Sequence, residues 1–109
     1  MNFEKLAGEI GFDNEDYLEL IELFINTTTD DIAKLKTAIN NGDFNAAENA
    51  AHSIKGAASS LGLMEISDEA KKIEYAAKGG ADKLTEISAG ELETMLNRIR
   101  ESYNASKGE

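Results

Sequence analysis

His52 is the single histidine of this 109-residue chain, and its neighbours suit an imidazole that acts as a nucleophile. An imidazole is partly unprotonated at neutral pH, so it needs no separate base to activate it. In a helix, offsets of three, four and seven residues place Lys55, Gly56 and Ser59 on the face that carries His52. The apolar residues of the same segment fall on a different face: Ala47, Ala51, Ile54, Ala58 and Leu61. The pattern therefore predicts an imidazole that points to solvent.

The neighbours of His52 favour a large, negatively charged reaction partner. A glycine inside a helix costs about 0.5–1 kcal/mol relative to alanine, and Gly56 lies away from the apolar face, so we interpret it as clearance for something approaching from outside. If the imidazole takes up a phosphoryl group, Lys55 offsets the incoming charge and Ser59 donates a hydrogen bond to the phosphoryl oxygens. The alternative is that both are ordinary surface residues. Glu48, four residues earlier, is a candidate partner for Nδ1 that would favour attack by Nε2; the alternative is a plain solvated carboxylate.

Four or five helices can be read from the sequence, and these must position the residues named above. Asp13 and Asp43 are predicted N-caps for the second and third helices, and Gly11, Gly42, Gly62 and Gly79-Gly80 are predicted breaks. No segment alternates with a period of two. We expect an all-α fold, an antiparallel up-down four-helix bundle with a short extra N-terminal helix, in which residues 1–103 form the domain and 104–109 a frayed tail. The predicted helices span residues 2–10, 14–40, 44–61, 64–78 and 82–103.

Composition narrows the classes of partner. The net charge of −10 disfavours nucleic acid and anionic membrane surfaces. The chain has no cysteine, which excludes disulfides and thiolate metal sites. It shows no signal-like leader and no apolar stretch long enough to cross a bilayer, so we expect a cytoplasmic protein. We expect a monomer, because bundles that pair usually show a longer apolar seam than this sequence has.

The segment around His52 resembles the signature of histidine-containing phosphotransfer (HPt) domains of multi-step two-component phosphorelays. The shared pattern is a histidine, two residues, Lys55-Gly56, small residues and then Leu61-Gly62. Asn41-Gly42-Asp43 resembles the family's entry to the site helix, and residues 70–79 resemble the helix that follows it. The resemblance implies that His52 accepts a phosphoryl group from a receiver-domain aspartate and passes it to another, with Lys55 and Gly56 in support.

The same resemblance implies which groups the partner contributes. Receiver domains of response regulators and hybrid histidine kinases bring the aspartate, the Mg²⁺ and most of the acid–base groups, so this chain needs no cofactor of its own and is no enzyme in its own right. Lys71, Lys72 and Lys78 are candidate contacts to the acidic face of a receiver, or else serve solubility alone. Phe3, Leu6 and Ile10 of the first helix are a candidate apolar docking patch around His52, or else belong to the core.

Two other functions are weighed against phosphotransfer. A di-metal carboxylate enzyme needs two Glu-x-x-His pairs, which one histidine cannot supply, so no metal site is expected. A helical adaptor, in which His52 is incidental, would tolerate the replacement of His52 by glutamine. The chain has no ATP-binding motif, so we expect no autophosphorylation. The sequence does not decide between a free-standing shuttle protein and a domain excised from a larger kinase. It also does not identify the cognate kinase, the cognate regulator or the input signal.

Overall fold

The computed structural model describes residues 2–106, and all of the secondary structure in that range is helical. The all-α class and the short first helix are therefore confirmed. None of the helices in residues 2–106 is long and apolar enough to span a membrane. The helices are α1 (Phe3–Glu9), α2 (Asn14–Asn40), α3 (Phe44–Ser60), α4 (Met64–Lys78) and α5 (Asp82–Ser106).

The two predicted aspartate caps begin α2 and α3. Asp13 accepts a hydrogen bond from the backbone N–H of Asp16 (2.9 Å), and Asp43 accepts one from that of Ala46 (3.1 Å). Each satisfies a helix N–H that has no partner within the helix. Gly42, just before the Asp43 cap, has a φ of 68°, a conformation that side chains resist. A turn of three residues therefore returns the chain from α2 into α3.

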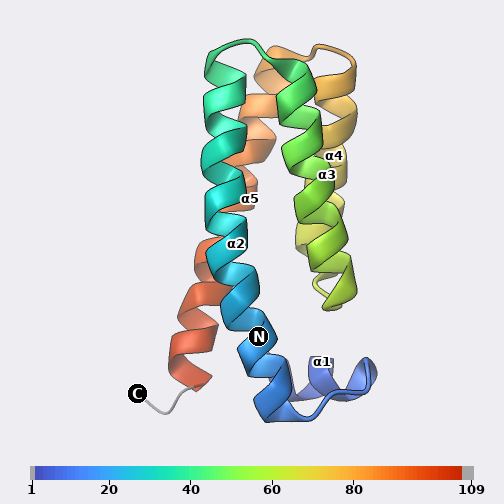
Figure 1. Cartoon of the computed structure of the whole chain (residues 1–109), viewed down its shortest axis with the longest axis vertical. Helices are drawn as coiled ribbons and strands as arrows, with labels where there is room; N and C mark the ends of the chain where they lie inside the picture. Colours follow the sequence, from blue (N-terminus) through green and yellow to red (C-terminus); the bar gives the residue numbers. More distant parts are fainter. Residues whose placement is uncertain (1, 107–109) are drawn as a thin grey trace.

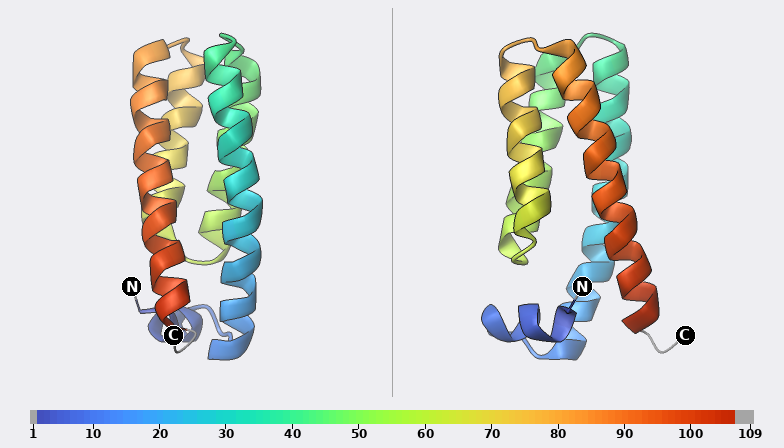
Figure 2. Two further views of the ribbon diagram at one scale, coloured as in Figure 1. Left: turned by 90° about the vertical axis from the view of Figure 1, so that its left-hand side faces the viewer. Right: turned by 180° about the vertical axis from the view of Figure 1, so that it is seen from behind.

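The four long helices lie side by side along the long axis of the molecule (Figures 1 and 2). Each packs against the next one in the chain, and α5 also packs against α2, so the four helices form a closed ring of contacts. Apolar residues and one threonine recur at alternating steps of three and four residues along α2, and this stripe faces the core: all of its members are buried except Leu18, which is half-buried. The buried members are Ile21, Ile25, Thr28, Ile32, Leu35 and Ile39.

The last helix departs from the predicted pattern at both ends. An apolar residue such as Leu84 is expected to face the core from the sequence, but it is 55% exposed, and Thr85 and Ser88 are buried in the same part of α5. Helix α5 also continues to Ser106, so residues 104–106 of the predicted tail are helical, and 107–109 lie outside the described residues. Tyr103 is buried and its hydroxyl donates to Glu22 of α2 (2.8 Å). This anchor holds the last turns of α5 against α2.

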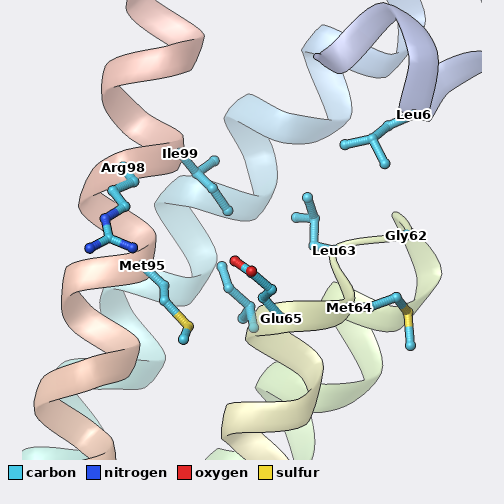
Figure 3. A pocket seen from close by; sticks show the side chains of 9 residues that line it. Leu6, Gly62, Leu63, Met64, Glu65, Met95, Arg98 and Ile99 are labelled. Carbon is cyan, nitrogen blue, oxygen red and sulfur yellow. The ribbon is translucent and has the colours of Figure 1, made fainter. Parts of the chain in front are cut away.

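Helix α1 closes one end of the bundle and does not form a patch around His52. Phe3 is 3% exposed and packs against the ring of Tyr17. Leu6 lines a cavity of about 290 Å³ between α1, the α3–α4 turn and α5 (Figure 3). His52 is eight residues, or about 12 Å of helix, from the end of α3 that faces α1 (Figure 1). The core alternative is therefore correct for Phe3, and the docking patch expected from this helix is wrong.

Tyr17 fixes the C-terminal end of α3. Its buried hydroxyl donates a hydrogen bond of 2.6 Å to the backbone oxygen of Leu61, the C-cap residue of α3. Burial, with a smaller effect of the Glu9 charge, raises the pKa of Tyr17 to about 12. The bond gives a partner to a carbonyl at the C-terminal end of α3 and fixes the position of α3 along α2.

Candidate functional site

His52 lies in the middle of α3 with its ring toward solvent. The side chain is 68% exposed, while Ala51 and Ile54 on either side of it are fully buried. The helix thus buries one face and presents the imidazole on the other, as the sequence predicts. The imidazole is therefore accessible to another molecule.

The inner ring nitrogen of His52 contacts a carboxylate on the neighbouring helix. Nδ1 lies 2.9 Å from Oε2 of Glu74 in α4, and the Glu74 side chain is only 11% exposed. A carboxylate only accepts hydrogen bonds, so this contact assigns a proton to Nδ1. In the neutral ring the lone pair then sits on Nε2. The geometry therefore selects Nε2 as the nucleophilic atom.

Lys55 binds the second oxygen of the same carboxylate. Its Nζ donates to Oε1 of Glu74 at 2.7 Å, and the Lys55 side chain is partly buried. This hydrogen bond holds the pKa of the Glu74 carboxyl below its usual value; burial opposes the shift, and the His52 contact adds to it. Glu74 is therefore a carboxylate at neutral pH and fixes the imidazole and the ammonium group relative to each other.

Glu48 does not hold the position that the sequence suggests. Its Oε2 lies 3.6 Å from Nζ of Lys78, and the contact expected between Glu48 and Nδ1 of His52 is wrong, because Glu74 provides it. The helix periodicity does put Glu48 one turn before His52, but the α3–α4 packing brings Glu74 to the inner side of the ring. Glu48 and Lys78 instead form a second link between α3 and α4 beside the site.

Gly56 and Ser59 lie on the exposed face with His52. A Cβ atom at Gly56 would meet nothing within 4 Å, so packing inside the chain does not require glycine there. Ser59 is exposed, and Ser60 donates to the backbone oxygen of Gly56 (2.9 Å). The surface next to the imidazole therefore consists of a glycine and small hydroxyl side chains, which leave space for a partner.

All three candidate docking lysines lie on α4. Lys71 has its Nζ 5.7 Å from the centre of the Tyr75 ring, and Tyr75 is 60% exposed. Lys72 is well exposed and lies 3.5 Å from Glu69. Lys78 is similarly exposed and lies 3.6 Å from Glu48, so all three lysines are at the surface and neither ion pair is short.

Glu74 is the functional residue that the helical wheel of α3 misses. It lies 22 residues after His52, so no spacing within one helix connects them. One signal was available in the fourth predicted helix: Glu74 is four residues after Ala70 and three before Ala77, two inward positions. A carboxylate beside an apolar face calls for a cationic or hydrogen-bonding partner, and the helix before it supplies both.

The described residues contain no group of three or more side chains suited to holding a metal ion. What they do contain is a solvent-facing nucleophile, oriented by a buried carboxylate and accompanied by one lysine. Such a site can attack an electrophile that another molecule presents.

Comparison with known proteins supports this chemistry. The family model described as "Hpt domain" matches residues 19–102. The structure also resembles the crystal structure of histidine-containing phosphotransfer protein B (HptB) from Pseudomonas aeruginosa PAO1, with a TM-score of 0.84 and 22% sequence identity over 94% of this chain and 90% of that one. No protein curated for its function matches the chain.

Proposed function

Because this chain belongs to the Hpt domain family, whose role is histidine phosphotransfer in phosphorelays, we propose that His52 is its phosphoryl-accepting residue. The donor is a phosphorylated aspartate of a receiver domain, and a second receiver aspartate takes the group on. The observation that carries the proposal is the 2.9 Å contact between Nδ1 and Glu74, which leaves Nε2 free at an exposed ring edge.

The transfer step follows from this geometry. The Nε2 lone pair forms a bond to phosphorus, and the bond between phosphorus and the aspartyl oxygen breaks, returning its electron pair to the receiver carboxylate. The ring keeps its proton on Nδ1 and becomes positively charged. Glu74, held as a carboxylate by Lys55, stabilises that charge as it develops. In the reverse direction the charged ring is the better leaving group, so the same contact serves both transfers.

The partner supplies what this chain lacks. Phosphoryl transfer depends mainly on alignment and on neutralising charge, and the Mg²⁺ of the receiver neutralises the aspartyl phosphate. This chain contributes a nucleophile, Lys55 as a nearby cation, and the open surface at Gly56 and Ser59. It needs no kinase activity of its own.

The scaffold for this role is the antiparallel up-down four-helix bundle that the sequence predicts. Its support is the closed ring of contacts from α2 through α5, joined by short turns. A rigid rod of this kind keeps the imidazole in one place while a partner docks. Lys71, Lys72 and Lys78 add positive charge on α4 toward an acidic receiver face.

The experiment is a transfer assay against purified, phosphorylated receiver domains from the source organism. We expect one or a few receivers to label the protein within seconds to minutes and the His52→Gln variant to stay unlabelled with all of them. Labelling of His52→Gln at the wild-type rate would contradict the proposal and favour an adaptor in which His52 is incidental.

A further inference from the structure

Lys55 shares one carboxylate with His52. Its Nζ and Nδ1 of the imidazole contact the two oxygens of Glu74, at 2.7 and 2.9 Å. The ammonium group and the ring are therefore separated by no more than the width of a carboxylate and its two hydrogen bonds. In the unphosphorylated protein the charge of Lys55 is already engaged.

A phosphoryl group on Nε2 would compete for that charge. It adds up to two negative charges and three acceptor oxygens to the ring that Glu74 holds. A lysine ammonium group is compact, carries three donors and ends a flexible stem, so it can change partner by rotating its last torsions. The Lys55 side chain is 29% exposed, which leaves room for that rotation.

Leaving Glu74 has a cost. The carboxylate is 11% exposed, and without Lys55 its remaining partner is His52. A largely buried carboxylate that loses a cationic partner is destabilised. The gain at the phosphoryl group is therefore reduced by the loss at Glu74.

We propose that Lys55 has two partners in turn: Glu74 while His52 is unphosphorylated, and the phosphoryl group once His52 carries it. Glu74 thereby competes with the phosphoryl group for Lys55. This competition weakens the interaction between Lys55 and the phosphoryl group, so that the group can still be transferred to a receiver. Glu74 is here a positioning residue, since it acts through Lys55. The inference rests on the proposed function of His52 and adds what sets the balance between accepting and donating.

The direct test follows the lysine itself. Protein labelled with ¹⁵N-lysine is phosphorylated with phosphoramidate, a small phosphoryl donor that needs no receiver, and the side-chain Nζ signals are recorded by NMR before and after. We expect the Lys55 signal to shift on phosphorylation and the Lys78 signal, paired with Glu48, to stay in place. A phosphorylated His52 with an unmoved Lys55 signal overturns this inference alone. No phosphorus on His52 from either phosphoramidate or a receiver overturns the proposed function as well.

A double-mutant cycle tests the consequence. The equilibrium distribution of the phosphoryl group between a competent receiver and this protein is measured at pH 8 for Glu74→Gln, Lys55→Gln and the double variant. We expect Glu74→Gln to favour the phosphorylated protein roughly five- to tenfold, the size of one partly exposed charged hydrogen bond, and Lys55→Gln to disfavour it similarly.

In the Lys55→Gln background, Glu74→Gln should no longer favour the phosphorylated protein, because only the direct contact between Glu74 and the ring is then lost. The matched control is Glu48→Gln, which removes a carboxylate that is paired with Lys78 and should leave the equilibrium unchanged. The competition is overturned if Glu74→Gln favours the phosphorylated protein equally strongly without Lys55, or if it favours the receiver while Lys55 is present.

Discussion

Nδ1 of His52 and Oε2 of Glu74, 22 residues apart in the chain, lie 2.9 Å apart across the interface between α3 and α4. The contact joins a side chain that is 68% exposed to one that is 11% exposed. It converts an ordinary surface imidazole into one with a defined proton position and a defined nucleophilic atom.

Removing the Glu74 carboxylate should slow acceptance of the phosphoryl group. Glu74→Ala frees the ring to rotate and removes the charge that stabilises it during transfer, so we expect roughly a ten- to hundredfold lower rate. Glu74→Gln keeps an oxygen that accepts from Nδ1 and should lose much less. Rapid-quench measurement of transfer from a phosphorylated receiver compares them. Equal rates for wild type and Glu74→Ala would rule out an orienting role.

A side chain at Gly56 should block docking without harming the fold. Because a Cβ there meets nothing within 4 Å, Gly56→Ala should raise the free energy of unfolding by about 0.5–1 kcal/mol. Gly56→Gln should fold as well but accept the phosphoryl group from a receiver at least tenfold more slowly, because its side chain occupies the surface over which the partner must pass.

The small donor phosphoramidate provides the control for this variant. It does not dock, so it should phosphorylate Gly56→Gln and wild type at similar rates. If the receiver also treats the two alike, the clearance interpretation of Gly56 fails. Chemical denaturation measures the stability change separately.

Charge reversal on α4 should slow association with a receiver. Lys71→Glu with Lys72→Glu replaces two exposed cations, and we expect a rate about three- to tenfold lower at low salt and a weaker dependence of the rate on salt concentration. Lys34→Glu with Lys83→Glu, at two exposed lysines of α2 and α5, is the matched control with the same net charge. Identical salt dependence for both pairs would show that α4 does not steer the encounter.

The low pKa of Glu74 predicts how stability depends on pH. A carboxyl whose pKa is lower in the folded than in the unfolded protein contributes stability above its unfolded value, about 4.5, and this contribution is lost as the pH falls through the lower folded value. Wild type should therefore exceed Glu74→Gln in free energy of unfolding by roughly 1 kcal/mol at pH 7, and the gap should narrow by pH 3. Urea denaturation of both proteins at the two pH values measures it; a gap that widens toward pH 3 has the wrong sign.

Much of the scaffold follows from local signals in the sequence. Asp13 and Asp43 mark the starts of α2 and α3 because a short side-chain oxygen there satisfies a free helix N–H, and this depends on nothing elsewhere in the chain. The exposed position of His52 follows in the same way, from the periodicity of one helix. The membership in the HPt family, given by residues 51–62, is confirmed by the match over residues 19–102.

What the sequence misses depends on contacts between helices. Glu74 reaches His52 because of how α4 packs on α3, and the wheel of α3 alone points to Glu48 instead. Leu84 is apolar yet exposed because its turn of α5 buries Thr85, whose hydroxyl bonds to the backbone of Ala81 and can therefore be buried. In both cases the outcome is decided by partners that periodicity does not reveal.

The most direct test of the account locates the phosphorus atom. Protein phosphorylated by a competent receiver is examined by ³¹P and ¹H–¹⁵N NMR of the ¹⁵N-labelled imidazole, which distinguishes the two ring nitrogens. The account predicts phosphorus on Nε2 of His52, with Nδ1 still facing Glu74. Phosphorus on Nδ1, or on any other side chain, would contradict it.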